Sequence, residues 1–178
     1  MKGRYLTVSV KSHIQRYIIE SIGSSIVKPG RDSALMAIIK PHLVLGSAID
    51  EEEPLPEGYA EIQIELPDLR QVYEAKSGKV YYCDTMFRDH IDRLGLERVR
   101  HFFNQTFKAA FRTFMDGYTE YQQENKAEDE SIKVKKGVCA FFNQYHITYD
   151  DTMVSSLTRD WYRHQERNEK NRFTPVLY

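Results

Sequence analysis

The chain has 178 residues, of which 41% are hydrophobic and 29% are charged, and its formal net charge is -1. This length and composition predict a single folded domain over residues 1–178 and argue against a disordered or low-complexity chain. The sequence shows neither a run of about 20 apolar residues nor a signal peptide, so we expect neither secretion nor a membrane span.

Charge is distributed unevenly along the chain. Residues 1–48 hold seven Lys or Arg and two Asp or Glu, a net charge of +5, and residues 131–178 hold eight and five, a net charge of +3. The middle, residues 49–130, holds ten and nineteen, a net charge of -9. Basic ends around an acidic middle predict a bipolar surface, unless the fold mixes these segments and leaves no coherent patch.

Three segments of the N-terminal half carry strand patterns. Apolar and polar residues alternate over 5–10 and again over 59–66, and Val80-Tyr81-Tyr82 follows a Ser-Gly turn. We expect these three strands to form a small antiparallel sheet. The four consecutive acidic residues and two prolines within 50–58 predict an exposed loop before the second strand.

Helical patterns lie between the first two strands. Apolar residues at helical spacing predict a helix over 14–22, and Gly23 provides a natural end for it. The Pro-Gly pair within 24–32 predicts a turn. A short helix is expected next, over 33–40, before Pro41 redirects the chain.

From residue 85 onward the pattern is helical. A short helix over 87–94 is expected, interrupted at Gly95. Large aromatic residues then recur every three or four positions over 97–122, which predicts a long helix at the hub of the core. The predicted fold class is α+β, a helix-dominated single domain with a small antiparallel sheet near the N-terminal half.

Residues 132–170 are predicted to form a C-terminal helical hairpin. Apolar spacing predicts helices over 134–145 and 149–170, joined by a short turn. Thr148, with Asp151 three residues later, resembles a capping box that begins the second helix.

No segment carries a recognisable catalytic or cofactor site. The glycines fit no phosphate-binding loop, and the six histidines form no zinc motif, so Asp89-His90-Ile91-Asp92 is interpreted as surface decoration. His164-Gln165-Glu166-Arg167 matches the H-x-x-R of tyrosine recombinases, but only eleven residues follow Arg167, too few for that chemistry. Cys83 and Cys139 are expected to be free thiols in a reducing cytoplasm, with Cys139 buried. We therefore expect a non-enzymatic protein without metal or cofactor.

Seven basic residues of the hairpin are the candidate nucleic-acid-binding residues. At about 100° per residue, four of them share one narrow stripe of the last helix: Arg159, Arg163, Arg167 and Lys170. The other three stand at the start of the preceding helix: Lys133, Lys135 and Lys136. Trp161 is expected on the opposite side of the last helix, in the core.

Helix-turn-helix proteins place their second helix in the major groove and surrounding cations on phosphates, an analogy for this hairpin that is weakened by the length of its second helix. Glu166 and Glu169 lie close to the basic stripe and reduce its net charge. An ordinary helical hairpin with a solvated charged face is therefore the alternative interpretation.

Four short stretches carry a resemblance to other sequences. Val8-Ser9-Val10-Lys11 leads into His13-Ile14-Gln15-Arg16-Tyr17-Ile18, and Phe141-Phe142-Asn143-Gln144-Tyr145-His146-Ile147 precedes Trp161-Tyr162-Arg163. Together they are similar to uncharacterised small proteins from phages and mobile elements of Bacteroides-type bacteria. The resemblance implies the cytoplasm of a bacterium or a phage-infected host, and it supplies no catalytic residue.

These observations favour a non-enzymatic, nucleic-acid-associated accessory protein of a phage or mobile element, which binds phosphates through the basic helix face. Such binding should depend steeply on salt and weakly on sequence. The alternative is a structural or assembly protein, for example a virion component, that contacts a protein partner or a second copy of itself and no nucleic acid.

Overall fold

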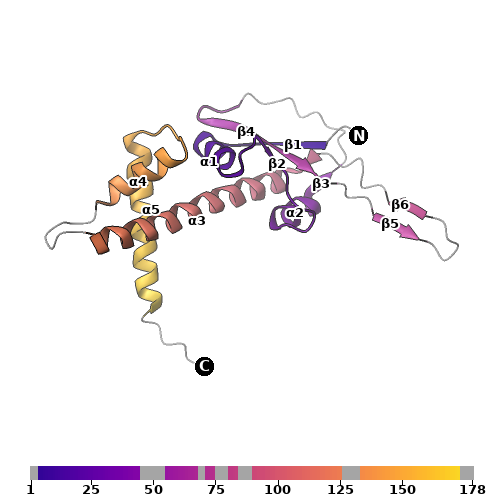
Figure 1. Cartoon of the computed structure of the whole chain (residues 1–178). Coiled ribbons are helices and arrows are strands. Elements are labelled where there is room, and N and C mark those ends of the chain that lie inside the picture. Colours follow the sequence, from indigo (N-terminus) through magenta and orange to yellow (C-terminus); the bar gives the residue numbers. More distant parts are fainter. Residues whose placement is uncertain are drawn as a thin grey trace. The chain divides into compact units, whose positions relative to one another are not determined.

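The structure is a computed structural model of the whole chain (Figure 1). It describes residues 4–44, 55–67, 71–74, 80–83, 90–125 and 133–172, and it describes backbone alone at 71–74, 80–83 and 169–172. The chain divides into two compact units, Met1–Gln105 and Thr106–Tyr178, with the boundary inside one long helix. The expected single domain over 1–178 stays a prediction, while the helix-dominated α+β class is confirmed.

The main sheet of the first unit has three strands. β1 (Arg4–Lys11) pairs antiparallel with β4 (Tyr59–Leu66) along its whole length, from Arg4 opposite Leu66 to Lys11 opposite Tyr59. On the other side of β4, β2 (Ile26–Val27) pairs in parallel. The sheet is therefore mixed, and the expectation of a purely antiparallel sheet is wrong. Strand β2 lies within the segment expected to be a turn, because two residues are too few to show an alternating pattern.

Two short strand pairs lie outside this sheet. β6 (Val80–Cys83) confirms the predicted third strand, but it pairs with β5 (Gln71–Glu74) rather than with β1 or β4. β3 (Leu43–Val44) pairs with β7 (His90–Ile91). Ile91 was expected in a helix, and that prediction is wrong. Helical spacing over a few residues cannot reveal a pairing partner that lies almost fifty positions away in the chain.

The first two helices of the chain lie within two residues of where local signals placed them. α1 (Ser12–Ile22) ends at Gly23, whose φ of 66° lies in the left-handed region that glycine adopts without strain. α2 (Ala34–Ile39) begins after Ser33, whose hydroxyl accepts a hydrogen bond from the backbone N–H of Met36. A 3-10 turn, η1 (Lys40–His42), follows it and contains the proline that redirects the chain.

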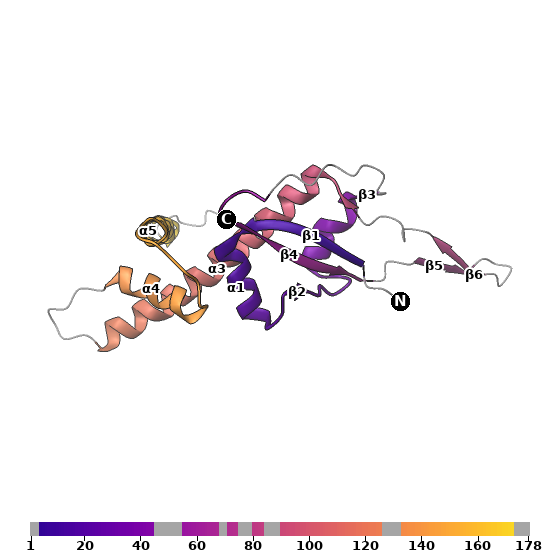
Figure 2. The same ribbon diagram turned by 90° about the horizontal axis from the view of Figure 1, so that it is seen from above.

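The core of the first unit lies on one face of the β1–β4 pair, and Figure 2 shows α1 and the first part of α3 beside this pair. The buried side chains of the two strands alternate as predicted: Leu6, Val8, Val10, Ile62, Ile64 and Leu66. Strand β1 forms one edge of the described sheet. Arg100 reaches this edge and donates from Nε to the carbonyl oxygen of Ser9 over 2.8 Å and from Nη2 to its hydroxyl. A charged side chain at this edge opposes pairing with a further strand.

Helix α3 (Arg93–Asn125) confirms the predicted aromatic helix and is longer than expected. It passes through Gly95 without interruption, so the expected break there is wrong. The Asp92 carboxylate caps the helix by accepting from the Gly95 N–H over 2.7 Å. A Cβ at Gly95 would clash with the Cβ of His42. Glycine is therefore needed here for close packing and not for a break in the helix.

In the second unit, α4 (Val134–Gln144) and α5 (Asp151–Arg172) join the second half of α3. Helix α4 lies very close to α3, because a Cβ at Gly137 would come within 2.7 Å of the Tyr118 ring. The Phe141 ring makes edge contacts with Phe107, Phe111 and Phe114 at centroid separations of 5.3 to 5.6 Å. Figure 2, which views α5 end-on, shows that α5 crosses the direction of α3 steeply.

The turn between α4 and α5 differs from the prediction in the residue that caps α5. His146 adopts a φ of 50°, which reverses the chain after α4. The side chain that caps α5 is Asp150, whose carboxylate accepts from the Met153 N–H over 2.8 Å. The predicted capping box of Thr148 and Asp151 is wrong, because the helix begins two residues later than that box requires.

Candidate nucleic-acid interface

Helix α5 separates its buried and exposed sides cleanly. Trp161 is only 2% exposed and Val154 is also buried, as expected for the side that faces the core. The exposed residues from 155 to 167 are Ser155, Ser156, Arg159, Tyr162, Arg163, Glu166 and Arg167. At about 100° per residue they fall on one arc of roughly 140°, which we call the outer arc of α5. Three arginines and one glutamate give the outer arc a net charge of +2.

Two arginines of the outer arc, Arg163 and Arg167, have no hydrogen-bond or ion-pair partner among the described residues. Arg159 is exposed as well, and its Nε donates to the carbonyl oxygen of Ser155 over 3.3 Å. Lys170 belongs to α5 by its backbone, but its side chain lies outside the description. The structure therefore presents three of the four stripe residues together on the outer arc.

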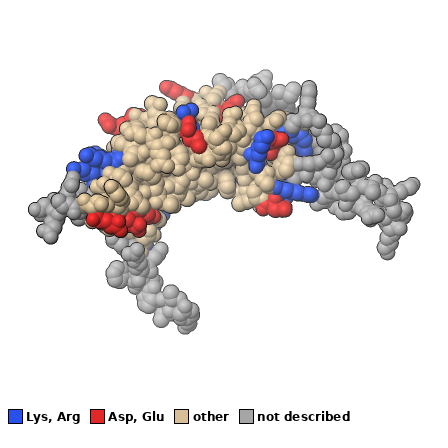
Figure 3. Space-filling model, viewed as in Figure 1, with Lys and Arg blue, Asp and Glu red and all other residues tan. Residues whose placement is uncertain are grey.

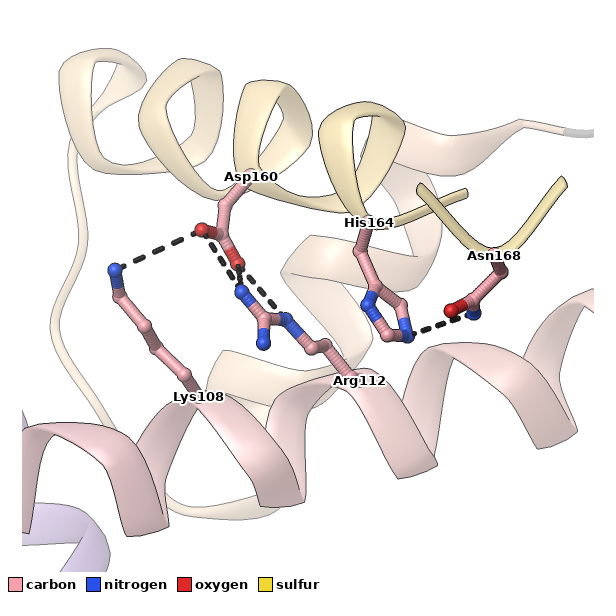
Figure 4. Close-up of polar contacts among 5 residues, drawn as sticks. All are labelled: Lys108, Arg112, Asp160, His164 and Asn168. Atoms are coloured by element: carbon pink, nitrogen blue, oxygen red, sulfur yellow. Dashed lines mark hydrogen bonds and ion pairs between the residues drawn. The ribbon is translucent and has the colours of Figure 1, made fainter. Parts of the chain in front are cut away.

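An outward-facing Asp160 carboxylate would reduce the positive charge of the outer arc, but this carboxylate faces inward. It is 21% exposed and faces α3, where Arg112 donates from Nε and Nη2 over 3.2 and 3.0 Å (Figure 4). Lys108, one turn earlier on α3, lies 3.6 Å from the same carboxylate. This cluster fixes α5 on α3 and removes the one acid next to Arg159 from the outer surface.

Sequence reasoning missed the cluster of Lys108, Arg112 and Asp160. The two cations stand four residues apart on α3, so they share a helix face. Their partner lies 48 positions beyond Arg112, and no local pattern indicates it. Beside the cluster, the side-chain amide of Asn168 lies 3.1 Å from Nε2 of His164 within α5 (Figure 4).

The three predicted lysines of α4 form a second basic group. Lys133 is the N-cap residue of α4, and Lys135 and Lys136 belong to its first turn, with all three exposed. A helix N-terminus already carries a partial positive charge, so lysines there favour an anion and do not stabilise the helix. Among the described residues, neither Lys135 nor Lys136 makes a hydrogen bond or ion pair with the outer arc of α5. The seven candidate residues thus belong to two groups on different helices.

Within residues 4–44, several cations of the basic N-terminal segment are paired with nearby acids. Three of its cations have acidic partners: Arg16 with Glu20 at 2.7 Å, Lys28 with Glu65 at 3.0 Å, and Lys40 with Asp32 at 3.7 Å. The hydrogen bond to Glu65 raises the pKa of Lys28 above its usual value.

Charges from different segments of the chain therefore come together. Lys28 of the basic N-terminal segment pairs with a residue of the acidic middle, and Asp160 of the C-terminal segment pairs with Arg112 of that middle. Figure 3 shows small basic and acidic groups on one face, with a basic group over the start of α4 and an acidic group over the end of α3. This pattern favours the interpretation in which the fold mixes the segments.

A further polar cluster joins η1 to the start of α3. His42 is buried, and its Nδ1 lies 3.0 Å from Asp92 and its Nε2 3.2 Å from Nη1 of Arg98. With Nδ1–H donating to the carboxylate, Nε2 accepts from the guanidinium. The Gly95 N–H and then His42 lower the pKa of Asp92. Both ring nitrogens are thus occupied, and we assign the cluster a structural role.

Cys139 was expected to be buried, and it is half-buried. It lies beside Tyr149, and its hydrogen bond raises the pKa of the Tyr149 hydroxyl. Among the described residues, no three His, Cys, Asp or Glu side chains are grouped as a metal ion would need.

No helix in the described part of the chain has the length and apolar character to cross a membrane. Comparison of the chain with models of known protein families, with curated proteins and with solved structures found no match. The function must therefore be argued from the arrangement of the side chains.

Proposed function

We propose that the protein is a non-enzymatic, nucleic-acid-associated accessory protein of a phage or mobile element, acting in the cytoplasm of a bacterium or an infected host. It binds phosphates through the outer arc of α5. The observation that carries this proposal is that Arg159, Arg163 and Arg167 are all exposed while Trp161 holds the opposite side of the helix in the core.

The spacing of the arginines fits a phosphate backbone. Arg163 and Arg167 are one helical turn apart, a rise of about 6 Å, which is comparable to the separation of neighbouring phosphates on one strand. Each guanidinium can donate two parallel hydrogen bonds to phosphate oxygens, which a lysine cannot do. Arg112 holds the Asp160 carboxylate against α3. Glu166 is therefore the one exposed acid of α5 between residues 155 and 167.

The small number of cations sets the expected strength. Three phosphate contacts predict a salt slope of about -2.7 for duplex DNA and about -2.1 for a single strand. The dissociation constant should then rise roughly 20- to 40-fold between 50 and 200 mM salt. Such binding is sequence-independent and steeply salt-dependent.

The test is a fluorescence-polarisation titration with labelled mixed-sequence DNA, single-stranded and duplex, at these two salt concentrations. Replacing Arg163 and Arg167 together by Ala should weaken binding and reduce the salt slope by roughly two counterions. Arg93→Ala is the matched control, since this side chain is 94% exposed but lies outside α5, and it should change neither quantity. Failure of both DNA forms to bind at 50 mM salt would refute the proposal.

The alternative function, a structural or assembly protein, is favoured by a different surface. Tyr121 is 62% exposed near the end of α3, and Tyr118 and Phe114, which stack on each other, are half-buried one and two turns earlier. Exposed aromatic rings of this kind are common in protein interfaces. Concentration-dependent self-association that Tyr121→Ala abolishes, without any DNA binding, would favour this alternative.

A further inference from the structure

One large aromatic side chain of α5 takes no part in the core. Tyr162 is 53% exposed, and the described residues provide it with no hydrogen bond or ring contact. Its neighbour in sequence, Trp161, is 2% exposed, and Phe107, Phe111 and Phe141, which join α3 to α4, are buried. Tyr162 is therefore not needed to hold α5 in place.

The outer arc has two different edges. On a helical wheel at about 100° per residue, Tyr162 and Glu166 fall on one edge of the arc. Arg159, Arg163 and Arg167 follow in order toward the other edge. A repulsive carboxylate and a flat ring thus stand beside a row of three cations. A phosphate backbone would avoid Glu166 and follow the arginines, which places its bases over the side that holds Tyr162.

We propose that the outer arc of α5 is a binding surface for single-stranded nucleic acid, on which Tyr162 stacks against a base while the arginines hold the adjacent phosphates. This inference rests on the proposed function and names its ligand class. In a duplex the bases are already stacked on one another, so an exposed ring on a helix face gains nothing from them. In a single strand every base offers a free face, and stacking on an aromatic side chain is tolerant of sequence.

A second exposed tyrosine provides the comparison within the same chain. Tyr121 is 62% exposed, but the charged residues exposed within one turn of it on α3 are Glu120 and Glu124, which repel phosphates. Only Tyr162 combines an exposed ring with adjacent exposed arginines in the described part of the second unit. Charge therefore distinguishes the two tyrosines, although their exposures are similar.

The experiment uses the full chain and a labelled mixed-sequence 12-mer, offered as single-stranded DNA, as single-stranded RNA and as a DNA duplex. The single strands should bind more tightly than the duplex. Tyr162→Ala should weaken single-strand binding at least about fivefold, within the range measured for base–aromatic stacking, and leave duplex binding and the salt slope unchanged. Tyr162→Phe retains the ring and should stay within about twofold of the natural protein. Tyr121→Ala should have no effect.

The outcomes separate the inference from the proposed function. If Tyr162→Ala binds single strands as tightly as the natural protein, while the Arg163 and Arg167 double variant loses binding, the stacking role is wrong and the phosphate interface stands. A preference of the natural protein for the duplex would also overturn the inference. If no probe binds at 50 mM salt, both proposals fail. Circular dichroism of each variant establishes that the fold is intact, as the exposure of Tyr162 predicts.

Discussion

Phe141 is the ring on which the second unit should depend most. Its side chain is fully buried on α4, and it meets three rings of α3 in edge-to-face geometry, those of Phe107, Phe111 and Phe114. Truncating a buried Phe to Ala costs about 3–5 kcal/mol, and each favourable ring pair adds roughly 0.5–1.5 kcal/mol to simple burial. Phe141→Ala should therefore fall at the upper end, at about 4–5 kcal/mol.

The single tryptophan makes this measurement specific to the second unit. Trp161 is buried on α5, so its emission should shift when this unit unfolds. Urea unfolding followed by this emission gives the loss of free energy of unfolding, and the melting temperature should fall by roughly 8–20 °C. Phe141→Leu, which keeps most of the volume but loses the ring edges, should cost about 1–2 kcal/mol.

An exposed aromatic residue on the same helix pair provides the control. Tyr121→Ala should change the stability by less than about 0.5 kcal/mol. A loss below about 1.5 kcal/mol for Phe141→Ala would refute the argument, because it would mean that the rings of α3 do not depend on α4 for their packing.

Three further changes test other contacts. Asp160→Asn leaves Arg112 without its carboxylate and should lower the free energy of unfolding by about 1–2 kcal/mol, and 1 M salt should reduce this difference. A variant as stable as the natural protein would contradict the assigned geometry. Asp150→Ala removes the cap of α5 and should lower the free energy of unfolding in urea by about 1 kcal/mol, whereas Thr148→Ala should lower it by less than about 0.5 kcal/mol. The reverse order would mean that Thr148 caps the helix. Burial, aided by Lys11, lowers the pKa of His13 from 6.5 to about 4, so the unfolded chain binds the proton more readily. Stability should therefore fall as the pH is lowered from about 6.5 toward 4, and His13→Gln should flatten that part of the profile.

Local signals predicted most of the individual elements. Alternation over β1 and β4 predicted both strands and their buried faces, and the aromatic spacing predicted α3, because each pattern follows from how one element presents its side chains to a core. The same reasoning placed Trp161 inward and Arg163 outward on α5. Residues 50–54 of the expected loop over 50–58 lie outside the described residues. Residues 87–89 of the helix expected over 87–94 lie outside them as well.

The candidate site was predictable only in part. The spacing of the arginines sufficed to place Arg159, Arg163 and Arg167 on one exposed side. Nothing in it indicated that Asp160 turns inward, since that depends on Lys108 and Arg112 of another helix. Tyr162 was visible in the sequence as well, but its exposure follows from where α5 packs.

Periodicity in the sequence was enough to predict the longer elements, β1, β4, α1, α3, α4 and α5, and the apolar side of each, but not the two-residue strands β2, β3 and β7. Contacts between distant segments emerge from the folded chain alone: the parallel pairing of β2 with β4, the pairing of β3 with β7, and the close packing of Gly95 against His42. Gly95 is an example. Its conformational freedom predicted a break in the helix, but its lack of a side chain instead allows close packing against His42, which lies 53 positions earlier. Periodicity shows how one element faces a core, whereas the identity of its partner depends on packing and hydrogen bonding between segments that are distant in the chain.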